Sequence, residues 1–208
     1  GDDKGLIMPP SIAPIQVVIV PILSKEGSEE IMSAAHEIVK KLKTEKIRVK
    51  LDDRDIRPGQ KYYDWEIKGV PLRIELGPRD LKSNSFMCAT RAGNKSSYNM
   101  DELLNSVRDE LNSVNNYMKE KANEHFNQHI KKMPHLEING STISLEEKLE
   151  EGYVYEMAFE GNDAEAEMIE KETGFSFLGV STSPYSKERE CVVSGRLTIN
   201  RVFLAKTY

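Results

Sequence analysis

The order of three hydrophobic patterns near the start of the chain limits what it can fold into. Residues 15–22 form a short run rich in β-branched side chains, which is typical of a buried strand. The apolar residues between positions 31 and 42 then recur at helical spacing, with Ser28 as the expected N-cap. Residues 47–51 alternate apolar and basic side chains and therefore predict a second strand. A strand, a helix and a strand in this order predict a right-handed parallel crossover.

Further patterns extend this prediction to residue 120. They are a helix from Pro58 to Gly69, strands at 72–76 and 86–89, and a long helix with an apolar stripe after Asn99. Residues 11–120 thus predict the order β-α-β-α-β-β-α. The expected fold class is α/β, with a mixed sheet flanked by helices.

From about residue 121 the pattern changes to shorter segments separated by turn residues. The expected elements are helices at 145–149 and 164–171 and strands at 153–159, 175–180, 191–193 and 198–204. They predict a small α+β domain with an antiparallel sheet. We therefore divide the chain into residues 1–10 as a linker, residues 11–120 as an α/β domain and residues 121–208 as the second domain.

Composition narrows the class of protein. Of the 208 residues, 38% are hydrophobic and 30% are charged, which suits one or two globular domains. The longest apolar run, residues 15–23, is shorter than the roughly 20 residues that a membrane helix needs. Cys88 and Cys191 offer no disulfide framework, so a reducing, cytoplasmic setting is expected. No secretory signal is visible, and because Gly1 is not a methionine we expect the chain to begin inside a longer protein.

The net charge of −5 conceals an uneven distribution along the chain. Residues 40–95 hold 15 basic and 8 acidic side chains, whereas residues 121–208 hold 10 basic and 15 acidic ones. A basic centre beside an acidic second domain predicts a polyanion-binding face. The alternative is a set of solvated helix faces, because phosphate contacts require basic groups that cluster in space.

Three stretches of the sequence are distinctive. They are GDDKGLIMPP at 1–10 with APIQV at 13–17, the segment 52–80 that ends in WEIKGVPLRIELGPRD, and FLAKTY at 203–208. Together they resemble prolyl-tRNA synthetases of the archaeal/eukaryotic type. The resemblance covers essentially the whole chain. It implies the C-terminal part of such a class II enzyme. The α/β domain would then be a class II synthetase anticodon-binding domain, and the second domain a small, formerly zinc-binding one.

The resemblance also implies which residues contact RNA. A proline tRNA has an NGG anticodon, so two guanines must be read in a single-stranded loop. A carboxylate can accept from guanine N1–H and N2–H, and an arginine fork suits guanine O6 and N7. The matching positions in this chain are Glu66, Arg73, Arg79, Asp80 and Lys95.

The residues also allow plainer interpretations. Glu66 and Lys68 fit an ordinary solvent-facing helix end, and Arg73 with Glu75 fits a surface ion pair on a sheet face. Residues 52–55 fit a structural loop that braces its neighbours. Trp65 could stack on a base, but it fits a buried core position better.

A zinc site of four cysteines, which many relatives carry, is degenerate in this chain. One pair of ligands would be Cys191 and Ser194, and the other would fall near Glu160 and Glu165. One thiolate and two carboxylates are a poor structural zinc site. We therefore expect no bound metal and a domain held by its apolar contacts.

The catalytic core of such an enzyme would precede this chain. The resemblance implies that the full-length enzyme is a proline–tRNA ligase that uses ATP and Mg²⁺, and that it is a homodimer. The part described by this sequence should bind tRNA(Pro), with no cofactor, no DNA and no membrane partner, and should be inactive alone. The resemblance also implies that the terminal carboxylate of Tyr208 packs toward the active site of the full-length enzyme. The alternatives are a free-standing RNA-binding or protein-interaction module with the same fold and a small metabolic enzyme, for which no phosphate loop or nucleophile–base pair is visible.

Overall fold

The computed structural model describes residues 1–23, 27–140 and 142–207. The prediction for Tyr208 therefore lies outside the described residues. The chain divides into two compact units, Gly1–Lys121 and Ala122–Tyr208. None of the described helices is long and apolar enough to cross a membrane.

The first unit is built on a five-stranded sheet with the order β2-β1-β3-β4-β5. Its strands are β1 (Val17–Pro21), β2 (Val49–Leu51), β3 (Leu72–Leu76), β4 (Ser85–Thr90) and β5 (Lys95–Asn99). β1 runs parallel to β2 and β3, whereas β4 and β5 are antiparallel to their neighbours. The predicted strand–helix–strand crossover is therefore present, and the mixed α/β fold class is confirmed.

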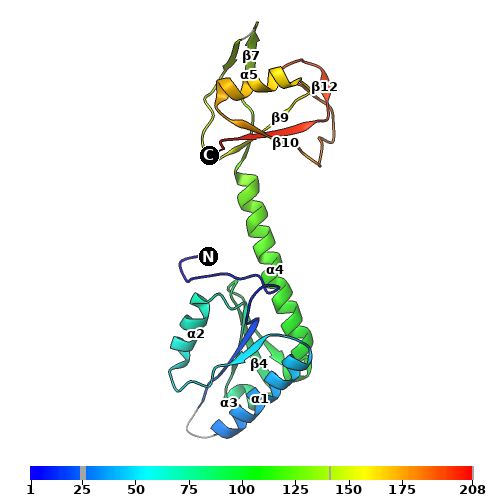
Figure 1. The fold of residues 1–208 in the computed structure, drawn as a ribbon. Coiled ribbons are helices and arrows are strands. Elements are labelled where there is room, and N and C mark those ends of the chain that lie inside the picture. Colours follow the sequence, from blue (N-terminus) through cyan, green and yellow to red (C-terminus); the bar gives the residue numbers. More distant parts are fainter. Residues whose placement is uncertain (24–26, 141, 208) are drawn as a thin grey trace. The chain divides into compact units, whose positions relative to one another are not determined.

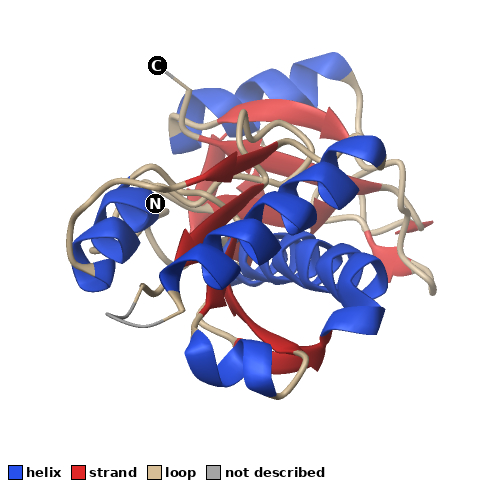
Figure 2. Ribbon diagram, turned by 90° about the horizontal axis from the view of Figure 1, so that it is seen from below, coloured by secondary structure: helices blue, strands red, loops and turns tan. Residues whose placement is uncertain are grey.

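Helices cover this sheet on both faces (Figures 1 and 2). α1 (Ser28–Thr44) and the first half of α4 (Leu103–Gln128) pack on one face, where the fully buried core includes Ile19, Leu42 and Phe86. α2 (Pro58–Ile67) packs on the opposite face of the sheet, against the β1 side chains there. On the same face, β4 and β5 present Met87 paired with Ser97 and Ala89 paired with Lys95.

Three local features of the first unit differ from the prediction. β5 was not predicted, because the sequence Lys-Ser-Ser-Tyr-Asn has no apolar alternation. The five-residue helix α3 (Pro78–Lys82) was not predicted either. α1 is preceded by Gly27 as its N-cap rather than by Ser28, with a left-handed backbone at φ 80° that favours glycine. Asn99 does cap the next helical segment, since its side chain accepts from Asp101 N–H.

The second unit contains a four-stranded sheet with the order β10-β13-β9-β6. These strands are β6 (Ile130–Lys132), β9 (Val154–Ala158), β10 (Ser176–Val180) and β13 (Arg201–Ala205). The pairing is antiparallel except between β6 and β9, which run parallel, so the sheet is not wholly antiparallel as predicted. α5 (Asp163–Thr173) contributes Ile169 to the core of this unit.

Two small ladders complete the second unit, and three predictions are corrected there. They are β7 (Leu136–Asn139) with β8 (Thr142–Leu145), and β11 (Arg189–Glu190) with β12 (Leu197–Thr198). The predicted helix at 145–149 is wrong, because Leu145 ends β8 in register with Leu136. The predicted strand at 191–193 is a turn in which Gly195 N–H donates to Cys191 O, and the predicted strand at 198–204 is split between β12 and β13.

Candidate nucleic-acid interface

The loop after β2 attaches α2 to the sheet through the buried carboxylate of Asp52. This carboxylate accepts from Trp65 Nε1 at 2.7 Å and from Arg54 Nε and Nη2 at 2.8 and 2.7 Å. The buried Lys61 Nζ donates to the backbone oxygen of Asp52 at 3.0 Å. Burial opposes ionisation, yet the hydrogen bonds from Arg54 and Trp65 lower the pKa of Asp52 to about 2. The segment 52–55 is thus a bracing loop, and Trp65 is a core residue rather than an open stacking surface.

Four charged side chains, contributed by α2, β3 and β5, lie close together. We call Glu66, Arg73, Glu75 and Lys95 the charged cluster. The sheet register explains how they meet, because Arg73 is opposite Ala89 on β4 and Ala89 is opposite Lys95 on β5. The small side chain of Ala89 leaves space between the two longer ones. Sequence reasoning brought three members together only by resemblance, and it did not predict the strand that carries Lys95.

Arg73 is the most constrained cation of the charged cluster. Its guanidinium lies 3.9 Å from the centre of the Tyr62 ring, which is a cation–π contact. Nη1 donates to Glu66 Oε1 at 3.3 Å, and Nε donates to Glu75 Oε1 at 3.1 Å. Its side chain is 14% exposed, so the pair with Glu75 is not the surface ion pair that spacing allowed. Burial, and then the charge of Glu75, raises the pKa of Tyr62 to about 12.

Glu66 and Lys95 are the members of the cluster that face solvent. Their side chains are 35% and 53% exposed, respectively. Within the described residues, Glu66 Oε2 has no hydrogen-bond partner, so one carboxylate oxygen remains free to accept. The hollow beside Glu66 and Arg73 has a volume of only about 10 Å³. The charged cluster is therefore an open surface rather than the lining of a cavity.

Arg79 and Asp80 lie on α3, directly beyond the end of β3. The carboxylate of Asp80 accepts from Gly77 N–H at 2.8 Å and so caps this short helix. Arg79 is exposed, and no carboxylate pairs with it in the part of the chain that the structure describes. The structure thus brings Glu66, Arg73 and Lys95 together but leaves Arg79 and Asp80 outside their hydrogen-bonded network.

Arg91, which the sequence did not mark, secures the start of the chain. It is buried, and its guanidinium forms a salt bridge with the Asp2 carboxylate. It also donates to the backbone oxygens of Gly5 and Glu66 at 3.2 and 3.3 Å. The Arg91 hydrogen bonds hold the pKa of Asp2 well below its usual value, although desolvation of the carboxyl opposes this. Residues 1–5 are therefore tied to the end of α2, next to Glu66.

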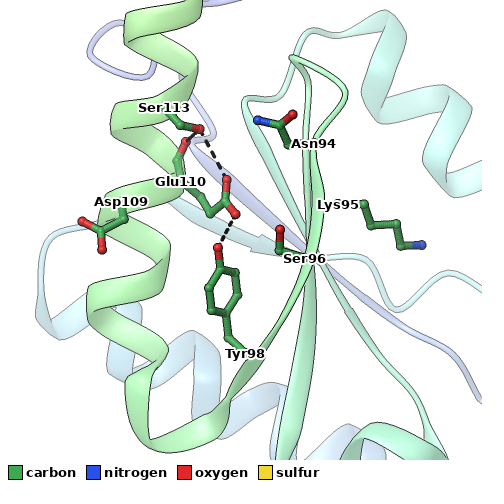
Figure 3. Close-up of a pocket in the computed structure, with 7 residues that line it drawn as sticks. All are labelled: Asn94, Lys95, Ser96, Tyr98, Asp109, Glu110 and Ser113. Atoms are coloured by element: carbon green, nitrogen blue, oxygen red, sulfur yellow. Dashed lines mark hydrogen bonds between the residues drawn. The ribbon is translucent and has the colours of Figure 1, made fainter.

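A second hollow lies on the other side of β5, between this strand and α4 (Figure 3). It has a volume of about 380 Å³, and the buried Glu110 within it accepts from Tyr98 Oη at 2.6 Å and from Ser113 Oγ at 3.3 Å. Figure 3 shows Lys95 pointing away from Glu110 and Tyr98, toward the opposite side of the strand. Lys95 thus borders this hollow, while its side chain extends to the face of the charged cluster.

The positions expected to match the degenerate zinc site have other roles. Cys191 Sγ accepts from Glu160 N–H at 3.1 Å, and the Glu165 carboxylate caps α5 by accepting from Asn162 N–H at 2.8 Å. Burial opposes ionisation of the thiol, but hydrogen bonds from Ser194 and from backbone N–H groups lower the pKa of Cys191. No group of three or more metal-ligating side chains occurs among the described residues. These side chains do not fit a structural zinc ion.

Known proteins resemble this chain along its whole length. Residues 16–110 match the family described as the anticodon binding domain. The chain is 40% identical over 210 residues to the proline–tRNA ligase of Methanosarcina mazei and 40% identical over 216 residues to that of Pyrococcus abyssi. These matches cover 100% of this chain but only 42% and 43% of the relatives. The chain thus spans less than half of the length of these relatives.

A solved structure gives the same result. The prolyl-tRNA synthetase of Giardia lamblia, in complex with prolyl-adenylate, matches with a TM-score of 0.76 and 27% sequence identity. The match covers 100% of this chain and 46% of that chain. The match therefore includes the residues of both units.

Proposed function

Because the chain belongs to the prolyl-tRNA synthetase family and carries its anticodon binding domain, we propose that it binds the tRNA for proline and reads the two anticodon guanines. Residues 11–120 are the anticodon-binding domain in this proposal. Residues 1–10 are the linker from a catalytic domain, and residues 121–208 are a zinc-binding-like domain that has lost its metal ligands.

The observation that carries this proposal is the pairing of an accessible acceptor with an accessible donor in the charged cluster. Glu66 offers a free carboxylate oxygen, and Lys95 offers an exposed ammonium group on the same face. Guanine presents N1–H and N2–H donors on one edge and O6 and N7 acceptors on another. A base splayed out of a single-stranded loop can therefore meet both groups, with Arg73 behind them. Arg79 and Asp80 contribute from α3, at the margin of the same surface.

The decisive experiment compares two RNAs bound by the 208-residue chain. One is a proline tRNA transcript, and the other carries adenine in place of both anticodon guanines. Adenine keeps the purine ring and N7, but it has an acceptor at N1, no amino group at C2 and an amino group in place of O6. Glu66 therefore loses the N1–H and N2–H donors, and Lys95 loses the O6 acceptor. We expect the dissociation constant to rise at least tenfold, which corresponds to about 1.4 kcal/mol. We define the discrimination ratio as the dissociation constant for the adenine-substituted transcript divided by that for the native transcript.

Salt separates this expectation from the alternative of a generic polyanion surface. Phosphate contacts weaken steeply with added salt, but they are equal in the two transcripts. We therefore expect both affinities to fall with salt while the discrimination ratio persists. Equal affinities with the same steep salt dependence would mean phosphate binding alone and would contradict anticodon reading.

The whole protein is, in this proposal, a cytoplasmic proline–tRNA ligase that uses ATP and Mg²⁺ and acts as a homodimer. Its reaction would take place in a domain outside these 208 residues, and we assign no residue of this chain to ATP or Mg²⁺. We expect this chain alone to show no proline-dependent exchange of pyrophosphate into ATP. Exchange above the background of a heat-denatured sample would contradict this division of labour.

A further inference from the structure

Glu75 is a buried carboxylate at the centre of an otherwise accessible charged face. Its side chain is only 6% exposed, and each of its oxygens is committed to a different cation. Oε1 accepts from Arg73 Nε at 3.1 Å, and Oε2 accepts from Lys95 Nζ at 2.9 Å. A buried carboxylate is stable only when it is paired and hydrogen-bonded. The two cations are therefore held where Glu75 places them.

Arg73 connects the buried Glu75 to Glu66, the accessible acceptor of the charged cluster. Arg73 lies between Glu75 on one side and Glu66 on the other, and the Tyr62 ring covers its face. The Arg73 donors are thus engaged by two carboxylates of this chain, Glu66 and Glu75. The planar guanidinium fork has a fixed geometry, so fixing Arg73 also fixes the direction of the Glu66 carboxylate. On the other side, the flexible four-carbon stem of Lys95 is fixed at its tip by Glu75.

We propose that Glu75 is the positioning residue of the guanine-reading site, which orients Lys95 directly and Glu66 through Arg73 without contacting RNA itself. This inference rests on the proposed function. In this proposal Arg73 does not read a base itself, because its guanidinium donors already bind Glu66 and Glu75. Preorganised donors and acceptors bind a matching base more tightly than mobile ones, since less side-chain entropy is lost when the base binds. Mobile side chains can instead turn away from a base that does not match them.

The test is Glu75→Gln in the 208-residue chain. Glutamine keeps the shape and one acceptor oxygen but loses the charge that holds two cations. We expect the discrimination ratio to fall about tenfold. Affinity for the adenine-substituted transcript should stay the same or increase, because the face gains one unit of positive charge toward phosphate. A merely destabilised domain would instead lose affinity for both transcripts together.

Two further variants make the assignment specific. Glu37→Gln makes the same charge change on α1, which covers the other face of the sheet, and should leave the discrimination ratio unchanged. Lys95→Met alters an exposed side chain and should lower the ratio without unfolding the domain, even if Glu75→Gln proves unstable. Because Glu75 acts partly through Lys95, the double variant should lose less than the two single losses added together.

The outcomes separate this inference from the function on which it rests. A wild-type chain without a preference for the native anticodon would overturn the proposed function. A wild-type preference that survives intact in Glu75→Gln would overturn the role of Glu75 alone. Fully additive losses in Glu75→Gln and Lys95→Met would also overturn it, because the two residues would then act independently.

Discussion

Replacing Asp52 by alanine is expected to lower the free energy of unfolding of the first unit by about 3 kcal/mol. The substitution leaves Trp65 Nε1–H without its acceptor in the interior and removes both short contacts to Arg54. Removing one partner of a buried ion pair costs about 3–5 kcal/mol. The lower end applies here, because Arg54 remains partly exposed and can be solvated. Urea unfolding followed by the fluorescence of Trp65, the single tryptophan, measures this directly.

Asp53→Ala is the matched control in the same loop. Asp53 is exposed and makes no hydrogen bond or ion pair among the described residues, so its loss should change the unfolding free energy by less than about 0.5 kcal/mol. Equal effects of Asp52→Ala and Asp53→Ala would contradict the bracing role of the buried carboxylate. Because Asp52 connects the loop to α2, we also expect Asp52→Ala to impair anticodon discrimination only under conditions that loosen α2.

Replacing Glu66 by glutamine is expected to reduce binding to the native proline tRNA by about 10- to 100-fold, which corresponds to roughly 1–3 kcal/mol for one bidentate base contact. The carboxylate can accept two donors from a guanine edge, whereas the amide presents one oxygen and one NH₂ group that opposes guanine N2–H. Binding to the adenine-substituted transcript should change little, so the loss appears in the discrimination ratio. Filter binding or fluorescence titration with both transcripts measures it.

Glu37→Gln controls for the added positive charge in this experiment as well. It should leave both affinities within about twofold, since Glu37 is exposed on the far face of the sheet. Equal weakening of both transcripts by Glu66→Gln would indicate a general loss of the fold. Unchanged discrimination would remove Glu66 from the reading site.

Much of the first unit could be predicted from local patterns. The run at 15–22 and the alternation at 72–76 became central strands, because each places apolar side chains on a face that a helix covers. β5 could not be predicted in this way. It is a polar edge strand that exists because β4 offers it a full ladder of backbone partners and because Tyr98 packs against Phe86.

The second unit shows how packing overrides local preference. The segment 145–149 has charged residues between two leucines, a spacing that favours a helix in isolation. Its Leu145 instead completes a hairpin with Leu136, and Leu149 reaches the core. The β-branched pair after Cys191 predicted a strand. The backbone there turns because Cys191 O accepts from Gly195 N–H and Cys191 N–H donates to Arg196 O.

The sequence by itself predicted the α/β fold class of the first unit and, through its resemblance to a known family, named Glu66, Arg73 and Lys95 of the charged cluster. Only the tertiary structure decided how these residues work together. Lys95 and Glu75 lie twenty residues apart, and their contact depends on the register of two strand pairs. Glu75 could form a surface ion pair or be a buried residue that holds two cations, depending on what covers it. Burial is a property of the packed molecule rather than of any local stretch of sequence.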